Sequence, residues 1–135
     1  MKQLFQKLFN RPPQSPDGLA QAQREAMVDV LFYCMYADNS LALKEEKIVA
    51  DTVGQISWDP KVSYDSYAAR AIAKARAVKE TPATRADFLA SVAQRLGARE
   101  LKQHTLALCR EIVHADGSVA DSERELLREL EQALT

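Results

Sequence analysis

Cysteine is scarce in this sequence, and its two copies stand where neither a metal site nor a disulfide framework is expected. Cys34 and Cys109 each lie in an apolar stretch, without a CxxC or Cys/His spacing. Structural zinc sites and small disulfide-stabilised domains both need such clusters. We therefore expect both cysteines to be reduced residues of a hydrophobic core.

Histidine and glycine are also sparse, and their scarcity argues against several classes of enzyme. The only imidazoles, His104 and His114, would lie about 280° apart around one helix, so they cannot converge within it. The four glycines form no phosphate-binding loop or dinucleotide fingerprint. The sequence predicts neither a catalytic triad nor a nucleotide site, and we expect a protein that is not an enzyme.

Long apolar runs and a large excess of either charge are absent as well. No run of about 18 apolar residues could span a bilayer, and the N-terminus lacks the apolar region of a signal peptide, so we expect a cytoplasmic protein. The net charge is −1, whereas nucleic-acid binding draws its affinity from clustered cations. No nucleic-acid partner is expected.

Helix-forming residues dominate what is present. In 135 residues, Ala, Leu, Glu, Arg, Lys and Gln are abundant and β-branched residues are few, which favours helix almost throughout. We predict an all-α fold, a compact helical bundle of about six to seven helices, with one domain over residues 19–135. Apolar spacing and turn residues place the main helices at about 19–37, 43–55, 63–79, 84–97, 98–115 and 121–134.

Residues 1–18 are predicted to stand apart from this domain. Leu4, Phe5, Leu8 and Phe9 share one face of a short amphipathic helix, and residues 11–18 form a linker with three prolines. This helix would dock on its own core, contact a protein partner, or lie on a membrane surface. One short apolar stripe does not decide between these three.

An internal repeat relates two turns of the chain at a shift of 78 residues, which is 116 minus 38. Residues 34–42, CMYADNSLA, fall on residues 112–120, IVHADGSVA, and Glu45 then falls on Glu123. Both copies continue with an apolar helix. The sequence therefore predicts two related helix-loop-helix halves.

Four carboxylates of this repeat share the apolar faces of their helices. Asp116 follows Cys109 and Ile112 by seven and four residues, and Glu123 precedes Leu126 and Leu130 by three and seven residues. Asp38 and Glu45 have the same spacings in the first copy. Residues at these spacings lie on one helical face, so all four carboxylates are predicted to point inward.

An inward Asp at a helix C-terminus needs compensation, because that end carries partial negative charge. Each Asp could accept backbone N–H groups of its own turn, while each Glu sits on the positive end of its helix. A divalent cation shared by these acids is a second possibility, and a basic partner is the third. The loops are not EF-hands, because Ala120, Asp121 and Leu127 occupy the fifth, sixth and twelfth positions from Asp116.

The second turn, Ala-Asp-Gly-Ser-Val-Ala-Asp-Ser-Glu at residues 115–123, with the helices on either side, resembles the TerB-like tellurite-resistance family. The resemblance covers residues 19–134, with a weaker copy at residues 37–45. It implies an all-helical fold with pseudo-twofold symmetry, a role in tellurite or stress resistance, and no catalysis. Its suggested metal-binding acids fall on Asp38, Glu45, Asp116 and Glu123. In the first copy Asn39 replaces the glycine of the pattern, and Leu43 replaces Asp121.

Two functions are therefore expected. The first is a non-enzymatic, TerB-like resistance protein that binds calcium, magnesium, manganese or zinc through these acids; water activation by that metal is a weaker variant. The second is an adaptor whose acids are structural caps. Residues 61–79 carry five cations against Asp65, and residues 116–131 carry six acids against Arg124 and Arg128, so a protein partner or self-association is expected through these faces.

Overall fold

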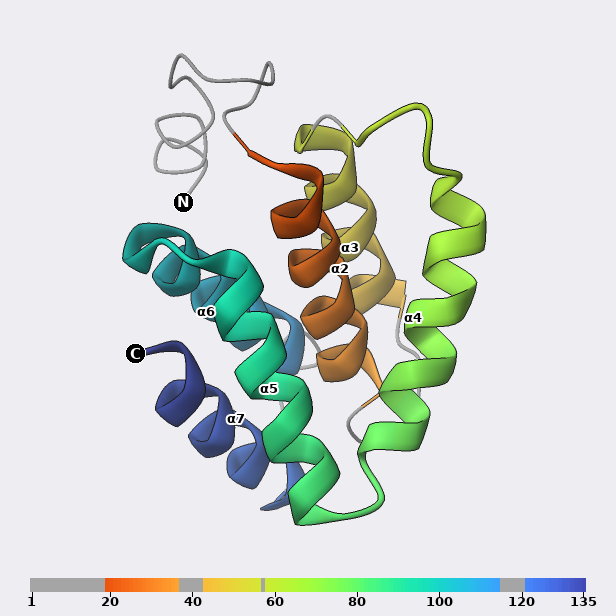
Figure 1. Ribbon diagram of the computed structural model, residues 1–135. Helices are drawn as coiled ribbons and strands as arrows, with labels where there is room; N and C mark the ends of the chain where they lie inside the picture. The colour runs from red at the N-terminus through yellow and green to blue at the C-terminus, as the bar shows by residue number, and fades with distance from the viewer. Residues whose placement is uncertain (1–18, 37–42, 57, 115–120) are drawn as a thin grey trace.

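The computed structural model describes residues 19–36, 43–56, 58–114 and 121–135, and these residues form an all-α bundle (Figure 1). The predicted fold class is confirmed, and no strand occurs in these four ranges. The predicted N-terminal helix and linker, residues 1–18, lie outside them. The helices are α2 (Gln21–Met35), α3 (Leu43–Gln55), α4 (Tyr64–Val78), α5 (Pro82–Leu96), α6 (Arg99–Val113) and α7 (Asp121–Leu134).

Helix α2 is the centre of the bundle. Every residue from 26 to 36 is buried, because α2 packs against α3, α4, α5 and α6 (Figure 1). Apolar spacing in the sequence predicted a helix over about residues 19–37. The structure buries the whole circumference, as expected for a helix that is apolar on all sides.

Polar side chains at the start of α2 bind the ends of two neighbouring helices. The Arg24 Nε donates to the Ile56 carbonyl, just beyond α3, at 2.7 Å, and the Gln23 Nε2 donates to the Leu96 carbonyl of α5 at 2.9 Å. Carbonyls at a helix C-terminus lack partners within the helix and carry partial negative charge. The start of α2 therefore lies beside the ends of α3 and α5, and α2 runs antiparallel to both.

Helix α4 runs parallel to α2 and is tied to it near both ends. Near its start, the Tyr67 hydroxyl donates to Asp29 Oδ1 at 2.7 Å. Beyond its end, the Lys79 Nζ donates to the Tyr36 carbonyl, which caps α2. These two contacts set the position of α4 along α2.

Asp29 is the polar centre of the helix packing. Only 3% of Asp29 is exposed, and its second carboxylate oxygen, Oδ2, pairs with the Arg95 Nη1 of α5 at 2.9 Å. Burial and the hydrogen bond to Asp29 raise the pKa of Tyr67 above its usual value, so this hydroxyl remains a donor. One carboxylate thereby joins α2, α4 and α5.

The cap of α5 differs from the prediction. Thr84 was expected to start this helix, but the cap is Thr81, whose hydroxyl accepts from the Thr84 N–H at 3.1 Å. Pro82 follows at the first helical position, where its fixed φ and missing N–H cost nothing. Ser63 caps α4, and Gly97 ends α5 at a φ of 73°.

The two predicted halves appear as adjacent helix pairs. Helix α2 packs against α3, helix α6 packs against α7, and α2 also contacts α6. Their environments differ, because α6 keeps an exposed face with Arg110 and Glu111, whereas α2 has none over residues 26–36. The pseudo-twofold relation between the halves stays a prediction.

The two cysteines belong to the core of the bundle. Cys34 and Cys109 are both buried and free, as predicted. Over the described ranges, the helices are too short or too polar for any of them to cross a bilayer.

The Asp29 contacts generate a stability prediction. Asp29→Ala should lower the free energy of unfolding by about 2–4 kcal/mol, because it removes the buried partner of Arg95 and leaves the Tyr67 hydroxyl only its longer hydrogen bond, to the Glu25 carbonyl. Urea denaturation measures this change. Glu125→Ala is the control: it removes the exposed pair with Arg128 and should change stability by less than about 1 kcal/mol. Equal losses in the two variants would contradict a central role for Asp29.

A second prediction concerns His104, which is fully buried in α6. Burial lowers its pKa from 6.5 to about 4, so between these values the unfolded chain takes up a proton that the folded chain does not. This contribution to stability is complete above pH 6.5 and is lost as the pH falls towards 4, by roughly 2–3 kcal/mol.

The measurement is urea unfolding at pH 7 and at pH 4.5. His104→Gln should lose less stability between these two pH values than the wild type does. His114→Gln, a substitution of the exposed histidine that follows α6, should behave as the wild type. An unchanged pH dependence in His104→Gln would contradict the assignment.

Candidate metal centre at the helix turns

The structure describes the side chain of one of the four predicted metal ligands. Glu123 lies in the first turn of α7. Glu45 lies near the start of α3, and its side chain is outside the described part of the chain. Asp38 and Asp116 are outside the described residues altogether. The candidate centre is therefore built from the ends of the helices that lead into its two turns.

Glu123 is buried, as its spacing predicts. Only 4% of this residue is exposed, and Leu126 and Leu130, three and seven residues further on, are also buried. In the same first turn, the side chain of Asp121 is 100% exposed. The helix thus separates two acids that are two residues apart, turning one to solvent and the other to the interior.

The position of Glu123 suits an anion. The first turn of a helix carries partial positive charge from its unpaired N–H groups, and α7 packs against α6. A carboxylate held in such a place can accept backbone N–H groups or coordinate a hard cation through oxygen. Both chemistries use the oxygen atoms of the same carboxylate.

The end of α6 shows how its own carbonyls are partly satisfied. The His114 Nδ1 lies 2.8 Å from the Arg110 carbonyl oxygen, and the residue is exposed. The Arg110 guanidinium pairs with Glu131 of α7 at 3.1 Å. His114 therefore contacts a carbonyl at the end of its own helix.

The end of α2, which precedes the first turn, has a different environment. The Lys79 Nζ donates to the Tyr36 carbonyl, and the Arg76 guanidinium lies 4.8 Å from the centre of the Tyr36 ring. Lys79, just beyond the end of α4, thus compensates the negative end of this helix, and Arg76 of α4 places a second cation beside it. The sequence placed both among the cations of residues 61–79, and no local pattern connects them with a helix end about 40 residues earlier.

Clusters of metal-binding side chains are not seen among the described residues. No three His, Cys, Asp or Glu side chains of these ranges stand close enough to hold an ion together. Glu123 is the one predicted ligand whose side chain enters that search, so its partners in any metal site would come from the turns themselves.

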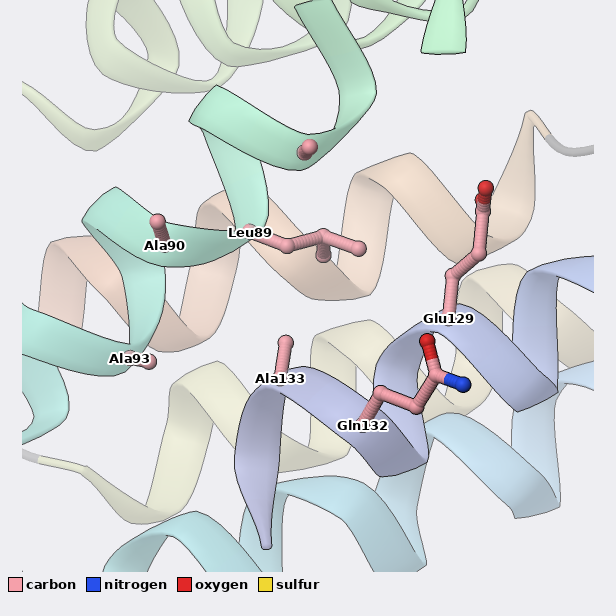
Figure 2. Close-up of a pocket in the computed structure, with 7 residues that line it drawn as sticks. Leu89, Ala90, Ala93, Glu129, Gln132 and Ala133 are labelled. Carbon is pink, nitrogen blue, oxygen red and sulfur yellow. The ribbon is translucent and has the colours of Figure 1, made fainter. Parts of the chain in front are cut away.

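A groove between α5 and α7 was not predicted (Figure 2). Its volume is about 520 Å³, and Leu89 of α5 and Ala133 of α7 face each other across it (Figure 2). Glu129 of α7, which lines the groove, pairs with Arg85 of α5 at 3.2 Å. The lining residues are Ala86, Leu89, Ala90, Ala93, Glu129, Gln132 and Ala133. The available signal was the group of alanines at one helical face of residues 86–93.

Comparisons of the chain with protein-family models, with curated proteins and with solved structures return no match.

Proposed function

We propose that this chain is a non-enzymatic, TerB-like protein of stress or tellurite resistance that binds a divalent cation through its inward-facing carboxylates. The ligands are Asp116 and Glu123 at the second turn and Asp38 and Glu45 at the first. The observation that carries the proposal is the burial of Glu123 beside the fully exposed Asp121.

A buried carboxylate is costly unless something compensates its charge. A cation coordinated by Glu123 and Asp116 would add to the interactions that Glu123 already makes, and it would hold the end of α6 against the start of α7. Carboxylate oxygens are the ligands that calcium, magnesium and manganese prefer, whereas zinc also accepts them. Oxygen ligands of this kind support a binding function and do not need a nucleophile or a base.

The second turn is the stronger half of the proposed site. Lys79 and Arg76 already stand at the end of α2, so negative charge near the first turn has cationic neighbours without a metal ion. The end of α6 has Arg110, which is engaged with Glu131. We therefore assign the principal ion to Asp116 and Glu123.

Thermal unfolding with added calcium, magnesium, manganese or zinc tests this function. A ligand that binds only the folded state raises its stability, by about 2.7 kcal/mol at a concentration one hundred times the Kd, which corresponds to several degrees in Tm. One ion should raise the Tm of the wild type, and Glu123→Gln and Asp116→Asn should abolish that rise.

Asp121→Asn is the matched control, because Asp121 occupies the same turn and faces solvent. It should keep the full response to the ion. No rise with any of the four ions, or an equal loss of response in Asp121→Asn, would leave the carboxylates as helix caps.

A second candidate function, a protein-interaction adaptor, is favoured by the exposed face of α4. Arg70, Lys74 and Arg76 are exposed and lie over the rings of Tyr67, Phe88 and Tyr36 at 5.7, 5.6 and 4.8 Å. No carboxylate of the described residues forms an ion pair with these three cations. Aromatic rings hold these cations in place on both sides of the exposed surface of α4, where they can receive an acidic protein surface.

A fluorescent polyglutamate peptide tests this face by fluorescence anisotropy. Binding should weaken roughly tenfold when salt is raised from about 0.05 to 0.5 M, because it is electrostatic. Replacement of Arg70, Lys74 and Arg76 by Gln should abolish it.

Replacement of Arg110, Arg124 and Arg128 by Gln is the control, because these three arginines are already paired with acids. This variant loses the same formal charge and should retain binding. Equal weakening in the two triple variants would show that peptide binding depends only on net charge. It would remove the support for an adaptor surface on α4. A labelled single-stranded RNA that bound in place of the peptide would also contradict this function.

A further inference from the structure

The groove between α5 and α7 is an apolar surface that small side chains leave open. Ala86, Ala90 and Ala93 line its α5 side, with Leu89 between them, and Ala133 lines its α7 side (Figure 2). Alanines remove bulk from a helix surface, so the larger side chains of another helix can enter between the two. Helix-in-groove binding uses this geometry, with anchors one turn apart.

We infer that this groove is the docking site of residues 2–10 of the same chain, which would bind through Leu4, Phe5, Leu8 and Phe9. These four side chains share one helical face, and they are large where the groove is lined by small ones. The inference is independent of the proposed cation site, because none of the groove residues belongs to the two turns.

The chain has the length to make this contact within one molecule. Gln23, close to the start of the described chain at Leu19, donates to the Leu96 carbonyl at the end of α5. The alanines at 86 to 93 lie within about 15 Å of that end along the helix, at about 1.5 Å per residue. Residues 11–18, an eight-residue linker, span up to roughly 25 Å when extended as polyproline. The whole groove is therefore within reach.

The charges of the two partners are complementary. Residues 1–16 carry Lys2, Lys7 and Arg11 and no acid, whereas α7 carries Glu125, Glu129 and Glu131. Glu129 lines the groove itself. Cations outside the apolar stripe would approach this acidic helix while the stripe enters the groove, and attraction of this kind favours the correct orientation of docking.

Tethering decides in favour of the same chain over a second copy. A short linker gives the attached segment an effective concentration in the millimolar range. A purified protein is studied at far lower concentrations, so a free copy competes poorly for the same groove. The docked segment would cover the groove in the monomer.

Paramagnetic relaxation in the full-length chain tests this inference. A nitroxide is attached after Gln3→Cys, a position outside the apolar stripe, and the native cysteines are buried. The amide signals of Ala86, Ala90, Ala93 and Ala133 should lose most of their intensity, while those of Ala50 and Asp51 on the exposed face of α3 should keep theirs. Uniform intensities, or losses confined to another face, would overturn the inference.

Three further variants separate docking from other causes. Ala90→Glu places a charge in the groove at an exposed position and should restore the intensities, whereas Ala73→Glu, the same change on the exposed face of α4, should not. Phe5→Ser with Phe9→Ser should act as Ala90→Glu does. Restoration by Ala73→Glu as well would overturn the assignment of the groove.

A mixed sample distinguishes the two possible copies. Isotope-labelled protein without the nitroxide is combined with unlabelled protein that carries it. The groove signals should keep their intensity in this mixture, because docking is intramolecular. Losses in the mixture equal to those in the single-chain experiment would show a second copy in the groove and overturn the inference.

Discussion

The arrangement of the bundle depends on one buried carboxylate, that of Asp29. Helix α2 has no solvent face over residues 26–36, so a polar group there must find its partners inside the protein. Tyr67 of α4 and Arg95 of α5 supply them. Apolar contacts alone would allow these helices to slide or rotate at modest cost. The geometry of two directed contacts on one carboxylate removes that freedom and selects a single packing.

Local patterns in the sequence predicted most of the helices, and contacts distant in the sequence explain what they missed. Spacing and turn residues located all six described helices to within a few residues, because both signals are contained in neighbouring positions. The central place of α2 was missed, since burial of its whole circumference depends on four other helices. The cap of α5 was misplaced by three residues because Thr81 and Thr84 are both capable of capping, and Pro82 decides between them.

For the candidate site too, the prediction that depended on neighbouring residues was right, and the contacts between distant segments were missed. The inward direction of Glu123 followed from Leu126 and Leu130 on its own helix, and the structure confirms it. The cations at the end of α2 were not predicted as its partners, because Arg76 and Lys79 arrive there through the parallel packing of α4. The groove was also missed. In a sequence, alanine indicates only a helix-forming residue. The open surface that several alanines line depends on the spacing between α5 and α7, which no local pattern contains.

The capping of α3 and α5 by the start of α2 has a consequence for synthesis of the chain. Arg24 and Gln23 bind carbonyls at residues 56 and 96, and the apolar surface of α2 also needs α6, which ends at Val113. Translation adds roughly 5–20 residues per second, so this apolar helix leaves the ribosome several seconds before its last neighbour. During that interval it is exposed, and the nascent chain is then most open to aggregation and to chaperone binding. The segment that organises the finished protein is the one that the growing chain must shield longest.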